Sequence, residues 1–396
     1  MKNQKAIPNS LKFYESMKFP IIISQCFGFF PISGITNTNC QNTKFKWRTW
    51  RMLYAFIIFL GMLVSVVTQF LNCIYYSLNI YETTSLVFSV LSIVDTLLFF
   101  KVALEWQQIC KEWHNVEKIM KNYDSNSLNL KRHIQVLSII FLCFGAIEHF
   151  LVLAYKLKDS FNLYSNAYDA LRHYFRITSE SHIFKFLPYN MWISIFFQMV
   201  NLISTFLWTY IDVFIMVIST ALTYRWKLIH YKIKKLKKAN VSNIYVWRTV
   251  REDYVRSCEL FELVNRKISY LVILSFTGNL YFILVQLYNS LRPMQHTLEK
   301  IYLYISFILL VLRIVCICIF GGNVYDESKK MRAILYSCNS EIYNKEIDRF
   351  LLNLNCYEIA ISGKNFFKIT RSLILNIAGA IVTYELVLIQ FSGILR

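Results

Sequence analysis

The chain has 396 residues, of which 56% are hydrophobic and 17% charged, and it carries a net charge of +19. Soluble domains are about 45–50% apolar and about 25% charged, so this composition argues against a soluble enzyme and favours a protein with several membrane spans. The positive charge could suggest a nucleic-acid partner, but its distribution along the chain points elsewhere.

Seven apolar stretches reach the length of about 20 residues that a helix needs to cross a bilayer. We therefore expect an all-α polytopic membrane protein with spans at Leu53–Tyr76, Thr83–Leu104, His133–Tyr155, Tyr189–Leu222, Ser269–Leu291, Ile301–Phe320 and Ser372–Phe391. The fourth stretch is longer than one crossing needs, so it should tilt or project beyond the membrane. The polar stretches 105–132, 224–268 and 321–371 have helical periodicity and should extend the neighbouring spans.

Lys and Arg gather in every second connector between these spans. The amino-terminal arm and the connectors 105–132, 224–268 and 321–371 hold 33 of them, whereas the other connectors and the tail hold 8. Because cytoplasmic loops carry the excess of Lys and Arg, we expect a cytoplasmic amino terminus and an extracellular carboxyl terminus. The charge is thus a topology signal, and no nucleic-acid partner is expected.

This topology predicts four parts of the chain. They are a cytoplasmic arm (1–52), spans one to six with an outward-facing ligand pocket and cytoplasmic helical extensions (53–320), a cytoplasmic anchor segment (321–371), and a seventh span with a short extracellular tail (372–396).

The last span contains side chains that a helix facing only lipid does not need. Glu385 is ionisable, and an acid inside a membrane is a functional candidate because its charge is costly there. Helical spacing also creates two adjacent stripes, with Thr383, Val387 and Gln390 on one face and Tyr384, Leu388 and Phe391 on the next. The simpler alternative is that Thr383 and Gln390 hydrogen-bond another helix.

The predicted outer halves of the other spans are polar and aromatic. Glu148 and His149 fit a cavity lining better than a metal site, because adjacent helix positions point about 100° apart. Asp95 could form an ion pair with Arg313 in the middle of the membrane, or either residue could face a ligand or ion path. The remaining candidates for binding a small polyhydroxy ligand are Trp192, Gln198, Asn201, Tyr281 and Gln286. Tyrosines near the rim could instead form an interfacial belt.

Motifs of catalysis and cofactor binding are missing from the sequence. It contains no Walker loop, GxGxxG, HExxH or CxxC pattern. We therefore predict a protein that is not an enzyme and that needs no cofactor or metal.

Thr383-Tyr384, followed after five residues by Gln390-Phe391, resembles the TYxxxxxQF signature of insect gustatory receptors. Similarity to the sugar-receptor subfamily extends over most of the chain, in the segments Gln25–Gly28, Pro31–Ile35, Phe45–Arg48, Glu105-Trp106, Leu207-Trp208, Asp212–Phe214, Gly363, Phe366–Arg371 and Thr383–Leu388.

The resemblance implies a sugar-gated, nonselective cation channel of the plasma membrane, built as a homotetramer or as a heteromer with related subunits. It places Gln390 and Phe391 at the gate of a pore lined by the seventh span, with Thr383, Tyr384 and Val387 supporting or lining the pore. The ligand pocket of each subunit would open outward among the second to sixth spans, and membrane lipids would surround the assembly.

Other functions remain open from the sequence. The chain could be a seven-span chemoreceptor for another small ligand, acting as an obligate heteromeric subunit or signalling metabotropically. A G-protein-coupled receptor would need the opposite orientation, and a transporter would show internal repeats or broken helices. A channel of the odorant-receptor type is the closest physical alternative.

Overall fold

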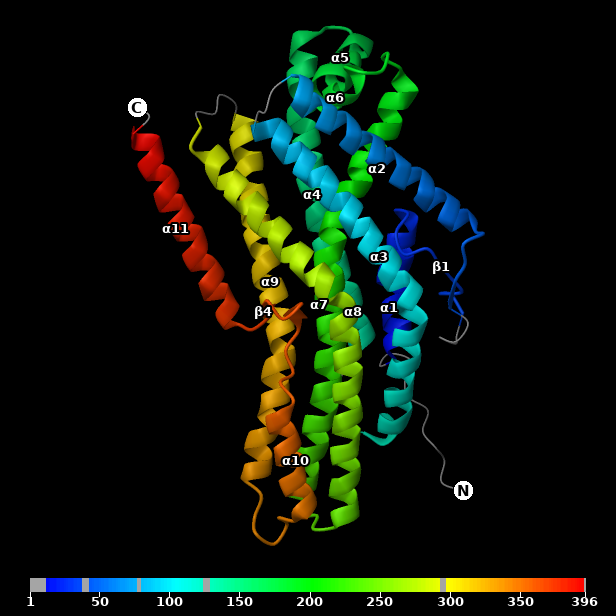
Figure 1. The fold of residues 1–396 in the computed structure, drawn as a ribbon, viewed down its shortest axis with the longest axis vertical. Helices are drawn as coiled ribbons and strands as arrows, with labels where there is room; N and C mark the ends of the chain where they lie inside the picture. Colours follow the sequence, from blue (N-terminus) through cyan, green and yellow to red (C-terminus); the bar gives the residue numbers. More distant parts are fainter. Residues whose placement is uncertain (1–11, 38–42, 77–79, 124–128, 293–296, 395–396) are drawn as a thin grey trace.

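The computed structural model describes residues 12–37, 43–76, 80–123, 129–292 and 297–394, with side chains up to residue 390. Most of this part of the chain is helical (Figure 1), in α1 (Phe13–Cys26), α2 (Trp50–Tyr75), α3 (Ile80–Ile119), α4 (Leu130–Leu163), α5 (Ala167–His173), α6 (Ser181–Phe184), α7 (Met191–Lys238), α8 (Ile244–Ser290), α9 (Thr297–Tyr336), α10 (Lys345–Cys356) and α11 (Ser372–Ile394). Short helical turns follow α3 and α5, as η3 (Met120–Asn122) and η4 (Tyr174–Ser179).

Seven of the described helices, namely α2, α3, α4, α7, α8, α9 and α11, are long and apolar enough to cross a membrane. This confirms the prediction of an all-α membrane protein with seven spans. Successive spans run in opposite directions in Figure 1, so the carboxyl ends of α2, α4 and α8 lie at the same end of the bundle as α5 and α6. The arrangement agrees with the predicted grouping of the connectors, and the choice of cytoplasmic side stays a prediction from the charge count.

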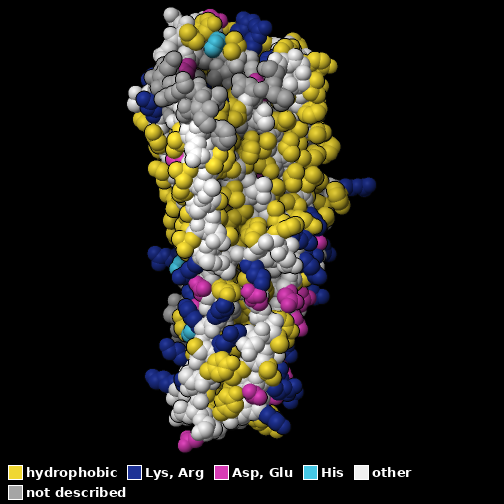
Figure 2. Space-filling model, turned by 60° about the vertical axis from the view of Figure 1, so that its left-hand side comes forward, with side chains coloured by type: hydrophobic (Ala, Val, Ile, Leu, Met, Phe, Trp, Pro, Cys, Tyr) yellow, Lys and Arg dark blue, Asp and Glu magenta, His cyan; other side chains and the backbone are white. Residues whose placement is uncertain are grey.

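The spans α7, α8 and α9 are much longer than a membrane crossing, with 48, 47 and 40 residues. Figure 2 shows a band of hydrophobic side chains in the upper part of the molecule and many Lys, Arg, Asp and Glu side chains below it. The described parts of the connectors 105–132 and 224–268 therefore extend the spans as helices, as expected, whereas 321–371 extends α9 only to Tyr336 and continues with the separate helix α10. Because α9 continues through residue 320, the predicted start of the anchor segment falls inside one helix.

Helix α7 lies at the centre of the bundle. The apolar 18-residue stretch of α7 that could cross the membrane is 78% buried. The corresponding stretches of the other six candidate spans are at most 50% buried. The stretch 209–219 is buried at every position. A helix that is apolar on all sides is stable only where other helices surround it, and α4, α8 and α9 supply that cover.

The amino-terminal arm is docked on the bundle through α1. Phe13 stacks on Trp113 of α3 with the ring centroids 3.7 Å apart, and the Phe13 backbone N–H donates to the Glu117 carboxylate at 2.8 Å. The same carboxylate forms a buried ion pair with Arg225 of α7. These contacts join α1, α3 and α7 through one buried carboxylate.

Two antiparallel hairpins interrupt the helical chain. One pairs β1 (Ile32–Ser33) with β2 (Lys44–Phe45), and the other pairs β3 (Ser362–Gly363) with β4 (Phe367–Lys368). After β4, Ile369 packs closely on α9, since a Cβ added at Gly321 would lie 2.6 Å from an Ile369 methyl carbon. Arg371 then pairs with Asp326 of α9 at 2.9 Å. The second hairpin therefore determines where α11 leaves the bundle.

Helix α11 stands apart from the other spans in Figure 1. The apolar 18-residue stretch of α11 that could cross the membrane is 0% buried. One stripe of the helix packs towards α8 and α9, and it consists of Leu373, Ile374, Ile377, Ile381, Tyr384 and Leu388. The rest of an apolar helix is left for lipid or for another protein surface.

Candidate ligand pocket

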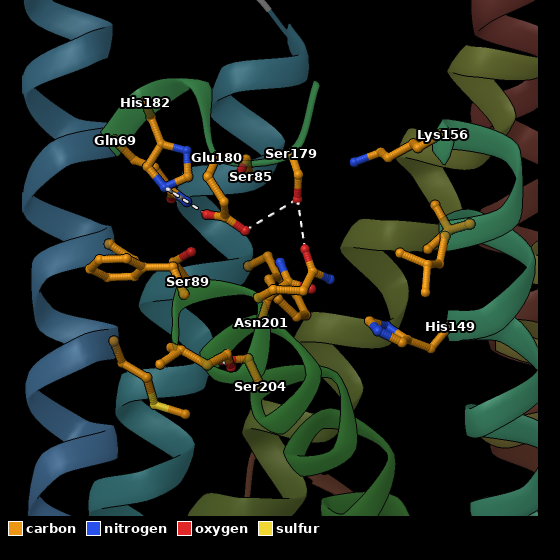
Figure 3. Close-up of a pocket in the computed structure, with 18 of the residues that line it drawn as sticks. Gln69, Ser85, Ser89, His149, Lys156, Ser179, Glu180, His182, Asn201 and Ser204 are labelled. Atoms are coloured by element: carbon orange, nitrogen blue, oxygen red, sulfur yellow. Dashed lines mark hydrogen bonds and ion pairs between the residues drawn. The ribbon is translucent and has the colours of Figure 1, made fainter. Parts of the chain in front are cut away.

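Polar side chains gather in a cavity at the end of the bundle that carries α5 and α6 (Figure 3). This polar cavity has a volume of about 90 Å³ and is bordered by α2, α3, α4 and α7 together with η4 and α6. Its hydroxyl, amide and charged lining consists of Ser65, Gln69, Tyr81, Ser85, Ser89, His149, Lys156, Tyr174, Ser179, Glu180, His182, Gln198, Asn201 and Ser204.

The side chain of Gln198 is oriented by the turn that covers the cavity. Its amide oxygen accepts hydrogen bonds from the Ser179 hydroxyl at 3.0 Å and from the Tyr174 hydroxyl at 3.3 Å. Both donors belong to η4, which folds as a π-helical turn and brings them over α7. Since the acceptor end of the amide is occupied, its NH₂ group is the end available to a ligand.

A buried acid and a buried histidine lie side by side under the same turn. A carboxylate oxygen of Glu180 lies 3.8 Å from Nε2 of His182, which in turn lies 3.3 Å from the Gln69 amide nitrogen. Burial raises the pKa of Glu180 to about 7, although the Ser179 hydrogen bond and the Lys156 charge oppose it. Burial lowers the pKa of His182 to about 4, so this ring is neutral near pH 7.

The Gln69 amide oxygen is buried and has no hydrogen-bond partner among the described residues. An unpaired buried acceptor costs free energy, and a ligand hydroxyl or a water would relieve that cost. The polar cavity therefore contains an acceptor, an amide donor and a carboxyl group that is close to its titration point near neutral pH.

A second, deep cavity lies nearer the middle of α7. Its volume is about 200 Å³, and it shares Phe88, His149, Val152 and Asn201 with the polar cavity. The Ser306 hydroxyl donates to the Glu148 carboxylate at 2.5 Å and accepts from the Gln286 amide at 3.1 Å. Aromatic side chains complete the lining, namely Trp208, Phe282 and Tyr302. The two cavities are thus neighbouring compartments with different balances of polar and aromatic surface.

A buried ion pair forms the floor of the deep cavity. Arg313 lines the cavity and donates to the Asp212 carboxylate at 2.7 Å and to the Trp208 carbonyl at 2.8 Å. Asp212 also accepts from Ser275 at 2.5 Å and from Asn279 at 3.1 and 3.2 Å. The network joins α7, α8 and α9.

The proposed ion pair between Asp95 and Arg313 was wrong, because Arg313 instead pairs with Asp212. Asp95 is 6% exposed, and its Oδ1 has no hydrogen-bond partner among the described residues. Asp212 stands at the centre of the most buried span, where several donors reach it, and this explains its preference for the arginine.

A profile of the trehalose receptor family matches residues 2–394, almost the whole chain. The chain belongs to the trehalose receptor family. Gustatory receptor for sugar taste 64a from Drosophila melanogaster is 28% identical over 395 residues, which cover 97% of this chain and 86% of that receptor. Gustatory receptor 5a for trehalose from the same species is 25% identical over 381 residues, which cover 96% of this chain and 85% of the relative.

The fold of this trehalose receptor family member also occurs in a solved structure. The insect olfactory receptor OR5 from Machilis hrabei in complex with eugenol aligns with a TM-score of 0.71 at 15% sequence identity, covering 97% of this chain and 100% of the other. The likeness shows a shared fold. The predicted resemblance to gustatory receptors is confirmed, and the protein is a multi-pass membrane protein of a receptor family.

The family member brings five of the eight predicted ligand residues together around the two cavities, namely Glu148, His149, Gln198, Asn201 and Gln286. Three others lie elsewhere. Trp192 is 79% exposed at the start of α7, and Asp95 is buried within α3 but lines neither cavity. The ring of Tyr281 packs against that of Phe282 with the centroids 5.1 Å apart. The role of all eight in ligand binding stays a prediction.

Sequence reasoning missed several lining residues of the polar cavity. Lys156 follows His149 by seven positions and therefore shares its helix face, so this spacing could have identified it. Glu180 and His182 belong to the connector 164–190, whose short turns have no long periodicity to indicate a cavity.

The predicted pore residues divide between two faces of α11. Tyr384 belongs to the stripe that packs towards the bundle, whereas Thr383, Val387 and Gln390 are exposed. Thr383 donates to the Gly379 carbonyl of its own helix at 2.9 Å. Phe391 lies in the helix, but its side chain is outside the described residues.

Proposed function

We propose that this protein is a gustatory receptor of the plasma membrane that binds a sugar and acts as a sugar-gated cation channel. The observation that carries the ligand class is the lining of the polar cavity. It combines hydroxyl and amide groups with the rings of Tyr81, Phe88 and Tyr174. Donors and acceptors match the hydroxyl groups of a sugar, and rings match its apolar C–H faces.

The two cavities approach the size of a small-molecule site only when they are taken together. Pockets for small molecules have volumes from about 300 Å³ upward. Neither the polar cavity at about 90 Å³ nor the deep cavity at about 200 Å³ reaches that size alone. The two together approach it, so we expect the ligand to occupy both and to contact the four residues they share.

The surface of α11 supports the channel part of the proposal. The apolar stretch of α11 that could cross the membrane is 0% buried, and it exposes the polar side chains of Thr383, Glu385 and Gln390. Polar and acidic side chains that face lipid are costly. In a tetramer, four copies of α11 would turn Thr383 and Gln390, which share one helix face, towards a central water-filled path, with Gln390 and Phe391 forming its narrow gate.

The network beneath the deep cavity offers a route from ligand to pore. Arg313 reaches the cavity, and its partner Asp212 is bonded to Ser275 and Asn279 of α8. Helices α8 and α9 are the spans that α11 contacts. A sugar opens the channel only if it binds the open state more tightly, and each tenfold change in population needs about 1.4 kcal/mol.

An inside-out patch recording tests this proposal in cells that express only this chain, with a panel of sugars in the pipette and no nucleotide in the bath. We expect sugar-dependent cation currents. Gln198→Leu keeps the size of the side chain but removes its hydrogen bonds, so it should raise the half-activating sugar concentration about tenfold, the equivalent of about 1.4 kcal/mol. Trp192→Leu is measured in parallel, because Trp192 is a predicted ligand residue that lies exposed outside the cavity, and an equal loss in this variant would count against a site inside it.

Each outcome distinguishes the proposal from its alternatives. Equal sugar responses in the Gln198 variant, the Trp192 variant and the unaltered chain would refute the polar cavity as the binding site. Silence from a chain present at the surface would exclude a self-sufficient channel, and co-expression with a related sugar receptor would then test an obligate heteromer. Currents that require nucleotide in the bath would indicate metabotropic signalling.

A different ligand class is favoured by one further observation. A cavity of about 340 Å³ between α1, α4 and α7 borders His149 and is lined mainly by apolar residues, among them Phe27, Leu142 and Phe206. It suits an apolar small molecule. Adding apolar compounds to the same panel separates this chemoreceptor function from sugar sensing.

A further inference from the structure

A groove on the outside of the bundle shares no lining residue with the two cavities of the candidate site. It has a volume of about 310 Å³ and lies between α4, α7 and α9. Its apolar part consists of Val136, Leu137, Ile140 and Phe320, and its polar end of His133, Lys227 and Asn323.

The lining changes from apolar to polar along α4 and α9, and along α7 it changes in the same direction from the hydroxyl side chain of Thr220 to the basic side chain of Lys227. On α4 the chain runs from His133 at the lower end to Ile140 above it. On α7 and α9, which run the opposite way, Thr220 and Phe320 lie above Lys227 and Asn323. One end of the groove is therefore apolar and the other end polar and basic.

The polar end lies at the level where the membrane ends. The Asn323 side chain accepts a hydrogen bond at 2.9 Å from Arg371, the residue directly before the membrane-spanning α11. The apolar part of the groove is therefore at the depth of lipid chains, and Lys227 is at the depth of headgroups.

We propose that this groove binds an anionic phospholipid from the bilayer, with one acyl chain along Val136, Ile140 and Phe320 and the headgroup at Lys227. Val136 and Ile140 are 47% and 44% exposed, which leaves their side chains accessible to a chain. Lys227 stands over the Tyr224 ring at 5.8 Å from its centroid, which holds the ammonium group beside the groove. Basic pockets between spans at a membrane surface favour anionic headgroups over neutral ones.

The position of the groove connects the lipid to α11. The headgroup would contact Asn323, whose amide oxygen is bonded to Arg371, and Arg371 also pairs with Asp326. These contacts hold the residue from which α11 departs. A bound lipid would therefore stabilise the joint between α9 and α11, whatever ligand the cavities bind.

Native mass spectrometry of the purified full-length protein tests the proposal without reference to channel activity. Phosphatidylserine, phosphatidylcholine with the same acyl chains, and glycerophosphoserine without chains are titrated separately. We expect phosphatidylserine to bind about fivefold more tightly than phosphatidylcholine, because one charge contact at a membrane surface provides about this factor. Glycerophosphoserine should not compete.

Three variants locate the binding. Lys227→Ala should lower the affinity for phosphatidylserine about fivefold, whereas Lys238→Ala, at the exposed end of α7, should leave it unchanged. Ile140→Trp fills the apolar part and should weaken both lipids. Unchanged preference in the Lys227 variant would overturn the proposal, as would equal loss in the Lys238 variant. Full competition by glycerophosphoserine would show a site for a soluble anion instead. A normal elution profile of the Lys227 variant confirms that it is folded.

Discussion

The buried pair of Arg313 and Asp212 should be one of the most sensitive points of the fold. Replacing Asp212 by Ala leaves the Arg313 guanidinium buried, with only the Trp208 carbonyl among its recorded hydrogen-bond acceptors. The same replacement removes the acceptor of Ser275 and Asn279. The side chains of Asp212 and Arg313 are 1% and 7% exposed, so the pair is shielded from bulk solvent, and Arg313 meets open space in the deep cavity that it lines.

The expected loss can be estimated from these contacts. Removing one partner of a buried ion pair costs about 3–5 kcal/mol. The unfolding entropy of soluble proteins, scaled to a chain of 396 residues, is about 0.8 kcal/mol per kelvin. Asp212→Ala should therefore lower the Tm by about 4–6 °C.

Asp95→Asn is the matched control, because Asp95 is also a buried carboxylate of the membrane region but is not paired with Arg313. Thermal unfolding of the purified proteins, followed by tryptophan fluorescence, should show a much smaller change for this variant. The double change Asp212→Leu with Arg313→Met should recover most of the loss, since two charges disappear together. If Asp95→Asn proved as destabilising as Asp212→Ala, the assignment of the ion pair would be refuted.

Two further predictions concern close packing and pH. Gly145→Ala should lower the Tm, because the added Cβ would lie 2.7 Å from the Thr209 hydroxyl oxygen. Its control, Gly379→Ala on α11, should be neutral or slightly stabilising, since nothing lies within 4 Å of the added Cβ. Equal effects of the two changes in thermal unfolding would contradict the tight contact of α4 with α7. Burial raises the pKa of Glu180 to about 7 from an ordinary value of 4.5, so the folded protein binds the proton more tightly. The contribution of Glu180 to the free energy of unfolding should therefore fall by up to about 3 kcal/mol as the pH rises from 4.5 to 7. The Tm of the unaltered chain minus the Tm of Glu180→Gln should fall over the same range. The pKa of His182 is lowered to about 4, so its contribution to the free energy of unfolding rises between pH 4 and 6.5, opposite to that of Glu180. The variant His182→Gln separates the two contributions. A Tm difference between the unaltered chain and Glu180→Gln that is independent of pH would exclude the titration of Glu180.

The number of spans and the grouping of the connectors could be predicted from the amino-acid sequence alone. Hydrophobicity adds up along a single helix and needs no distant partner, so stretches such as 372–391 could be recognised as spans in isolation. Five cavity residues were predictable for a related reason, namely Glu148, His149, Gln198, Asn201 and Gln286. Each is a polar side chain in an apolar helix, and such residues usually face the interior of a bundle.

The pairing of distant side chains could not be read from the sequence and depends on how the helices pack. Whether Arg313 pairs with Asp95 or with Asp212 depends on how α3, α7 and α9 are rotated against one another, and no local pattern contains that information. The same holds for the connector that brings Glu180 and His182 over the cavity, and for the groove that ends at Lys227. These sites are built from helices far apart in the sequence, and their geometry is fixed by side-chain packing across the whole bundle.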